Sequence, residues 1–209
     1  MDDTELRAAL AAERTELAEL LGALPDADWD TPSLCQGWRV REVVAHSTMA
    51  FRARLPHFLI EMVKARGSMN RMLDRTARRD AAVMTPAQLT AALRDNAHHP
   101  WKPPGGGYEG ALTHEIVHGL DSTIALGIDR QIPADRLLPV LNGMASPRGL
   151  KFFHVDLAGV QLRATDMDWR FGTGAPLMGT GADLLMVLGG RRLPAGRLRG
   201  DHSARFAAA

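Results

Sequence analysis

The sequence is poor in cysteine: Cys35 is the only one among 209 residues. A single cysteine cannot form an internal disulfide, and chains without disulfides are typical of reducing compartments. The opening stretch MDDTELRAAL is acidic and helical in character, which is typical of neither a secretory signal nor a transit peptide. We therefore predict a cytoplasmic location.

The chain also lacks a long apolar run and an excess of charge of either sign. No hydrophobic stretch approaches the roughly 20 residues that cross a bilayer as a helix, so we expect no membrane partner. The 25 basic and 24 acidic side chains give a formal net charge of +1, which supplies no electrostatic reason to expect nucleic acid. The partners that remain are small molecules, and the sequence leaves open whether the chain forms a homodimer.

Apolar residues at helical spacing predict four helices in the first part of the chain. The third has a clear start, because Thr85 can cap the helix and Pro86 suits its first turn. Gln88 can then complete a capping box with Thr85. Between the helices, residues 68–84 are Arg-rich and weakly periodic, which favours irregular helix or loop, and PWKPPGGG at 100–107 must be a loop. The four predicted helices span residues 3–24, 39–66, 85–98 and 108–126.

The pattern changes after Gly127. Residues 133–144 have helical spacing, and SPRG then breaks the helix. LAGVQLRATD and MDWRFGTG alternate with period two and predict a hairpin, while GADLLMVLGGRR returns to helical spacing. We therefore predict an α+β protein, with a four-helix bundle over residues 1–130 and a small α+β domain over residues 131–209.

The segment HEIVHGLD places two histidines four residues apart on the last predicted helix of the bundle. His114 and His118 then project from one face, one helical turn apart, and two imidazoles at this spacing can share one metal ion. Two ligands make a weak site, so a third is needed. His46, at the edge of the apolar stripe of the second helix, is the best candidate for it. The alternative is that these histidines are simply packed and hydrogen-bonded.

The same segment also reads H-E-x-x-H, the signature of zinc peptidases, in which Glu115 would activate a metal-bound water. One peptidase class takes a downstream glutamate as third ligand, and no glutamate follows Glu115. Another needs glycine and histidine where this chain has Asp121 and Ile124. Asp129 stays open as a ligand, so a metal-dependent hydrolase is retained as the third hypothesis.

The segment SLCQGWRVREVVAHS, in which His46 is the next-to-last residue, resembles the hallmark segment of the DinB-like superfamily. The chain is most similar within it to the actinobacterial mycothiol-dependent maleylpyruvate isomerase family. This resemblance implies a four-helix bundle that holds a divalent metal, usually zinc with nickel as the alternative, on His46, His114 and His118. The isomerases proper have glutamate at the position of His114, and this difference weakens the assignment of maleylpyruvate as the substrate.

The resemblance further implies mycothiol as the thiol cosubstrate. A metal-bound thiol has a lowered pKa and is a nucleophilic thiolate at neutral pH. The thiolate can add to an activated double bond and leave after rotation, which is isomerisation, or stay attached, which is conjugation. We therefore expect a metal-dependent, mycothiol-using transferase or isomerase that acts on a small electrophilic substrate. The alternative from another class is a metal-binding protein without catalysis.

Glu115 and Asp121 are the candidate catalytic residues. Glu115 lies about 100° around the helix from His114, where it acts as a general base or, as we favour, simply faces solvent. Asp121 follows the ligand face and is expected either to accept an imidazole N–H or to be an ordinary polar residue.

The other candidates depend on charge or position. Arg191 and Arg192 are candidates for binding a substrate carboxylate, and the loop at 100–107 either gates the site or merely connects two helices. Cys35 and Trp38 are expected to be packing residues, with Trp38 closing the end of the bundle. A cluster of arginines, expected to be a solvated basic face, is the alternative anion site: Arg71, Arg75, Arg78 and Arg79.

Overall fold

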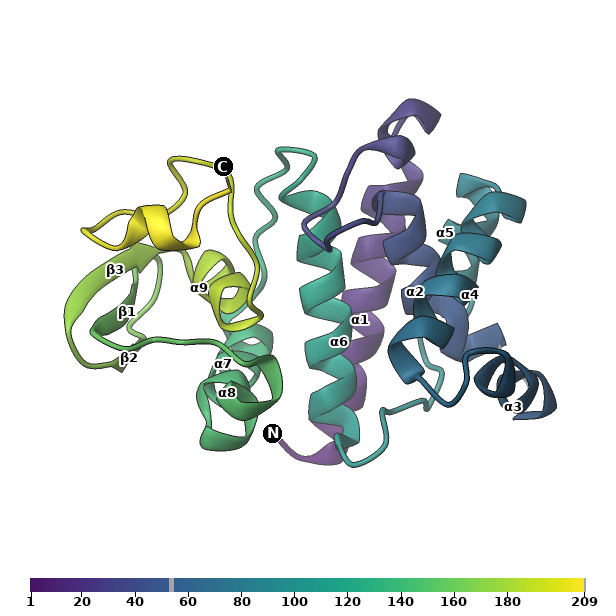
Figure 1. The fold of residues 1–209 in the computed structure, drawn as a ribbon, viewed down its shortest axis with the longest axis horizontal. Helices are drawn as coiled ribbons and strands as arrows, with labels where there is room; N and C mark the ends of the chain where they lie inside the picture. The colour runs from purple at the N-terminus through teal and green to yellow at the C-terminus, as the bar shows by residue number, and fades with distance from the viewer. Residues whose placement is uncertain (53–54, 209) are drawn as a thin grey trace. The chain divides into compact units, whose positions relative to one another are not determined.

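The computed structural model describes residues 1–52 and 55–208. They form two compact units, Met1–Ser122 and Thr123–Ala209 (Figure 1). The first is helical, and the second combines helices with a small sheet. This confirms the predicted α+β class, while the domain boundary at residue 130 stays a prediction. Among the described residues, no helix is both long enough and apolar enough to cross a membrane.

The first unit is built from helices that pack through small and branched apolar side chains. Helix α1 packs against α5, and α2 packs against both α4 and α5. Leu10, Leu17 and Leu21 of α1 and Leu89 and Leu93 of α5 are at most 2% exposed, and burying such a side chain contributes about 2 kcal/mol. The helices are α1 (Asp3–Gly22), α2 (Val40–Arg52), α3 (Leu55–Lys64), α4 (Met69–Val83), α5 (Pro86–Arg94) and α6 (Gly107–Thr123), with the 3-10 helix η1 at Asp26–Asp30.

Local capping explains where two of these helices begin. Asp2 accepts from the backbone of Glu5 while the Glu5 side chain accepts from the Asp2 amide, and this capping box starts α1. Thr85 and Gln88 form the same reciprocal pair at α5, with Pro86 in its first turn, which confirms the predicted helix start.

The single helix predicted over residues 39–66 corresponds to α2 and α3, and residues 53–54 between them lie outside the described residues. Another expectation for the middle of this unit was wrong. The segment 68–84, predicted as irregular helix or loop, is the 15-residue helix α4. Ser68 caps α4, and its buried face is formed largely by the small residues Thr76, Ala77 and Ala81, so it lacks the strong apolar stripe that signals a helix.

The second unit contains a three-stranded sheet in the order β2-β1-β3. Strands β1 (Val160–Ala164) and β2 (Arg170–Gly172) pair antiparallel, with Leu162 opposite Phe171, which confirms the predicted hairpin. Strand β3 (Ala175–Gly179) pairs parallel to β1 and was not predicted, because five residues between two glycine-rich turns give little periodicity. Every residue of the following helix α9 (Gly181–Leu188) is buried.

Helix α7 (Ala134–Ala145) ends at the SPRG segment, as predicted, but a further helix begins there. Ser146 accepts from the amide of Gly149 and caps α8 (Pro147–Phe153), with Pro147 at its first position. A Cβ atom on Gly149 would lie 2.6 Å from the carbonyl oxygen of Gly143. The close approach of the two helices therefore requires glycine at this position. The 3-10 helix η2 (Ser203–Phe206) lies near the end of the described chain.

Replacing Gly149 by alanine should destabilise the protein, because the added methyl group meets backbone atoms that cannot rotate away. We expect the free energy of unfolding to fall by about 1–3 kcal/mol, measured by urea denaturation. The matched control is Lys151→Ala, an exposed position on the same helix, which should change it by less than about 0.5 kcal/mol. Equal effects of the two substitutions would contradict the close approach.

Candidate metal centre

Three histidines from two helices meet in the first unit. His46 comes from α2, and His114 and His118 come from α6. One ring nitrogen from each lies within 4.8 Å of the others, and Nε2 of His46 lies 3.2 Å from Nε2 of His114. The structure therefore brings together the three residues that were selected from the sequence as metal ligands.

The packing of α2 against the bundle decides where His46 points. One face of α2 is buried through Val40, Val43 and Val44. His46 lies at the edge of this face, less than one turn after Val43, so its side chain is directed into the bundle. The connection before α2 is tied to α6, because the amide of Leu34 donates to the carbonyl oxygen of Asp121 at 3.0 Å. The result is that the ring of His46 lies 4.9 Å from the ring of His118 and 5.1 Å from that of His114.

Two of the three imidazoles, those of His46 and His114, are held uncharged by their surroundings. Burial, with a smaller effect of His118 nearby, lowers the pKa of His46 to about 3. Burial also lowers the pKa of His114 well below its ordinary value, and the neighbouring histidines act in the same direction. Near neutral pH these two rings therefore present lone pairs rather than positive charge, which is the state in which histidine binds a metal.

Asp121 fixes the orientation of the third ring. Its side chain is fully buried, and its Oδ2 lies 3.0 Å from Nδ1 of His118. When Nδ1–H donates to this carboxylate, Nε2 keeps its lone pair and is free to face the other two histidines. The expectation that Asp121 accepts an imidazole N–H thus agrees with the geometry.

These residues fit a divalent metal ion. Ligand nitrogens 2.0–2.1 Å from a tetrahedral zinc lie roughly 3.3 Å from one another, close to the 3.2 Å that separates the two Nε2 atoms. A single N–H···N hydrogen bond can join only two of the three rings, so it leaves the third lone pair without a partner. In the described part of the chain, Nδ1 of His46 and Nδ1 of His114 are also buried without a hydrogen-bond partner. One cation would satisfy all three facing nitrogens.

Residues 10–99 match the model of a protein family described as the mycothiol maleylpyruvate isomerase N-terminal domain. This match covers less than half of the chain, so it shows a likeness of the N-terminal unit to that domain. It includes the segment that contains His46 and stops before α6, so it does not cover His114 or His118.

Two solved structures have the same fold as this chain. One is a crystal structure of the mycothiol-dependent maleylpyruvate isomerase, with a TM-score of 0.63 and 14% sequence identity. The other is a histidine-to-alanine mutant of that enzyme, with a TM-score of 0.62 and 13% identity. Each match covers 97% of this chain and 94% of the other. No curated protein sequence matches the chain significantly.

Two tryptophans lie beside the histidines of the candidate metal centre. The ring of Trp38 lies 5.1 Å from that of His46, and its Nε1–H donates to Asp74 at 2.7 Å. The ring of Trp101 lies 5.3 Å from that of His114. Trp101 belongs to the loop at 100–107, so this loop does shape the site, while a gating role stays untested. Trp101 was not selected from the sequence as a site residue. The available signal was its position, as an aromatic residue shortly before the helix that carries His114 and His118.

Glu115 does not face solvent, so the favoured interpretation was wrong. Its side chain and that of Arg14 on α1 are both fully buried, with Nε of Arg14 donating to Oε1 of Glu115 at 2.9 Å. Burial raises the pKa of Glu115 to about 7, although Arg14 acts in the opposite direction. Glu115 is therefore directed from α6 toward α1, where Arg14 is its salt-bridge partner. It is not directed toward the three histidines.

Arg14 itself was missed in the sequence. It occupies a position between Leu10 and Leu17 on the apolar stripe of α1, and a charged residue on such a stripe was the available signal. Separating the pair would leave an unpaired charge in the core, which costs roughly 3–5 kcal/mol.

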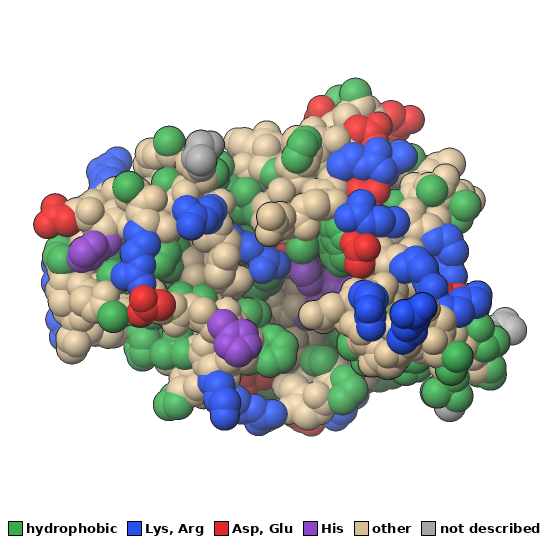
Figure 2. Space-filling view, in the orientation of Figure 1, with side chains coloured by type: hydrophobic (Ala, Val, Ile, Leu, Met, Phe, Trp, Pro, Cys, Tyr) green, Lys and Arg blue, Asp and Glu red, His purple; other side chains and the backbone are tan. Residues whose placement is uncertain are grey.

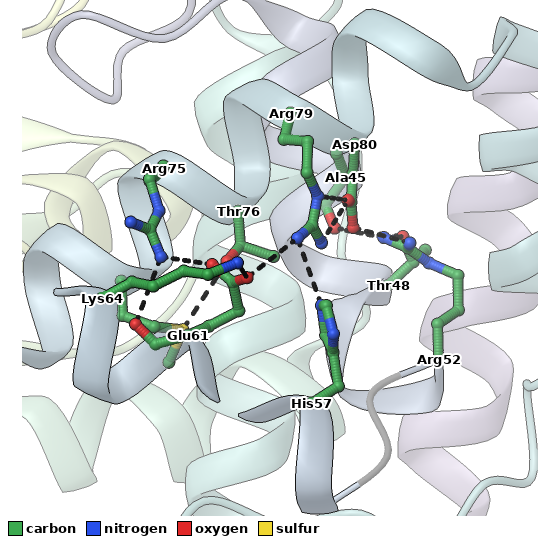
Figure 3. A network of polar contacts seen from close by, with 11 residues as sticks. Ala45, Thr48, Arg52, His57, Glu61, Lys64, Arg75, Thr76, Arg79 and Asp80 are labelled. Carbon is green, nitrogen blue, oxygen red and sulfur yellow. Dashed lines mark hydrogen bonds and ion pairs between the residues drawn. The ribbon is translucent and has the colours of Figure 1, made fainter. Parts of the chain in front are cut away.

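The arginine cluster on α4 is largely engaged in ion pairs. Arg75 and Arg79 contact Glu61 of α3, and Arg79 also contacts Asp80 (Figure 3). Arg78 pairs with Asp74 at 2.9 Å. Figure 2 shows these basic side chains gathered over α4, beside hydrophobic side chains over α3. The cluster therefore corresponds to the expected solvated face, with acidic partners already in place.

The remaining candidates are Cys35 in the first unit and two arginines in the second. Cys35 is half-buried in a turn where its carbonyl accepts from the amide of Trp38 at 3.0 Å, in keeping with the expected packing role. Nη1 of Arg191 donates to the carbonyl of Gly189, and Nη1 of Arg192 donates to that of Ala207. Binding of a substrate carboxylate by these two arginines stays a prediction.

The depressed pKa of His46 has a measurable consequence for the metal-free protein. Above pH 6.5 the ring is neutral in both the folded and the unfolded chain, so no stability is lost there. As the pH falls from 6.5 toward 3, the unfolded chain takes up a proton that folded His46 does not, and the free energy of unfolding decreases by about 1.4 kcal/mol per pH unit.

Urea denaturation in the presence of a chelator, repeated between pH 7 and pH 5, would measure this loss. The variant His46→Gln cannot take up this proton, so its stability should fall less steeply than that of the wild type. Parallel curves for the two proteins would contradict the burial of a neutral His46.

Proposed function

We propose that this protein is a metal-dependent, mycothiol-using isomerase or transferase that acts on a small electrophilic substrate. The observation that supports this most is the convergence of His46, His114 and His118 in a chain whose residues 10–99 match the mycothiol maleylpyruvate isomerase N-terminal domain. Three protein ligands leave a tetrahedral ion one further position, which is the arrangement of catalytic rather than structural zinc. Zinc is the metal that we propose, with nickel as the alternative.

The bound metal would lower the pKa of a coordinated thiol and so supply a thiolate at neutral pH. The residues of the chain prepare the site for it. His46 and His114 remain uncharged because they are buried, and Asp121 holds His118 in one orientation. Trp38 and Trp101 cover the rings of His46 and His114 and so keep water from part of the site.

Of the two candidate catalytic residues, Asp121 has the better-supported place. It contacts a proposed ligand directly, so its role is to orient His118 and raise its basicity. Glu115 has no such contact and is instead paired with Arg14. Arg191 and Arg192 remain our proposed contacts for a substrate carboxylate, and we retain the cytoplasmic location as part of the same proposal.

Purified without a histidine tag, the wild-type protein should contain about one equivalent of divalent metal, measured by elemental analysis. His46→Ala and His118→Ala should each lose most of it, because two imidazoles make a weak site. The matched control is His57→Ala, which removes an exposed histidine that contacts Arg79 and should retain the metal. Full metal content in both ligand variants would exclude the site proposed here.

The metal-loaded protein should consume mycothiol in the presence of an electrophilic alkene, measured as loss of free thiol for conjugation or as cis–trans conversion for isomerisation. The thiol dependence follows from the need for a nucleophile that the chain does not itself supply at the histidines. Stoichiometric metal without thiol binding or turnover across a broad set of acceptors would favour the non-catalytic metal-binding alternative. Turnover of amide or ester substrates without thiol would favour the hydrolase.

A further inference from the structure

Arg14 is a fully buried charged residue in the middle of α1, and its contacts extend well beyond Glu115. Nη1 of Arg14 donates to three backbone carbonyls that follow the end of α5. The acceptors are Asn96 at 3.4 Å, Ala97 at 3.3 Å and His99 at 2.9 Å. One guanidinium thus binds a carboxylate on one side and a turn of backbone on the other, which its planar arrangement of donors allows.

The backbone that Arg14 holds leads directly to the metal centre. The amide of Trp101 donates to Nδ1 of His99 at 3.2 Å, so the position of His99 influences that of Trp101. The ring of Trp101 in turn lies against His114. Hydrogen bonds from a charged guanidinium to backbone carbonyls are stronger than neutral ones, so the buried Arg14 stabilises this turn.

Arg14 also contacts both helices that carry the proposed ligands. Its acceptor Glu115 is the residue directly after His114 on α6. Its guanidinium lies 4.5 Å from the centre of the Phe51 ring, and Phe51 follows His46 on α2. The ring of Phe51 also lies 5.1 Å from that of His99. A single side chain therefore touches α2, α6 and the segment 96–99, which together carry or adjoin every residue around the metal centre.

We propose that Arg14 is a positioning residue of the metal centre, which fixes α6 and the segment 96–101 so that His114 and Trp101 keep their places. This inference rests on the proposed metal binding. It also gives Glu115 a role that differs from that in H-E-x-x-H peptidases, because here the glutamate anchors the ligand helix to α1. Arg14 touches neither metal nor substrate, so its effect should appear in the geometry of the site.

The test replaces the ion pair by apolar residues of similar size, in the double variant Arg14→Met/Glu115→Leu. Such exchanges commonly preserve stability, since no unpaired charge remains. The probe is Co²⁺, whose visible absorption spectrum responds to coordination geometry. We expect the double variant to fold, to bind Co²⁺ about tenfold more weakly than the wild type and to have a changed cobalt spectrum, as is usual when the support of metal ligands is removed.

The control is Arg7→Met, an exposed arginine on the same helix, which should leave Co²⁺ affinity and spectrum unchanged. A folded double variant with wild-type affinity and spectrum would overturn the positioning role, because Arg14 would then only stabilise the core. If the double variant does not fold, Arg14→Lys decides by the same two readouts, since one ammonium cannot satisfy the carboxylate and the three carbonyls together. Absence of Co²⁺ binding in the wild type would instead reject the proposed function itself.

Discussion

Helix α6 is buried or half-buried at every position from Ala111 to Thr123, and this single constraint governs the rest of the first unit. A buried helix that carries His114, Glu115, His118 and Asp121 must find a partner for each polar side chain, because unpaired polar groups in a core are costly. Oε1 of Glu115 accepts from Arg14, and Asp121 pairs with His118. His46 and His114 share a contact through their Nε2 atoms, and a metal ion is the partner that would satisfy the three rings together.

The two polar faces of α6 therefore have different tasks. On one face the ring nitrogens of His114 and His118 converge with that of His46, and burial keeps His46 and His114 uncharged, which is the chemistry of a metal centre. On the other face a charged pair connects α6 to α1 and to the turn after α5. We propose that the second face holds α6 in place for the first, so that the metal centre depends on the ion pair through the position of one helix.

Sequence reasoning was reliable where the chemical signal was local. The helix start at Thr85 and Pro86 follows from capping, and the pair of histidines on one face follows from the helical repeat. It failed where the signal was weak or was overridden by packing. Helix α4 buries mainly small residues, and strand β3 is five residues long. Neither presents a long row of large apolar side chains, which is the signal that the sequence predictions used.

By itself, the sequence determined the helical character of the first unit, the spacing of His114 and His118, and the selection of His46 by its family-like segment. Only the tertiary structure decided that Glu115 faces Arg14 and that Trp101 covers His114. The physical reason is that helical periodicity defines directions around one axis, whereas these contacts depend on which neighbouring element each direction meets. For Glu115 that neighbour is α1, 101 residues away in the chain.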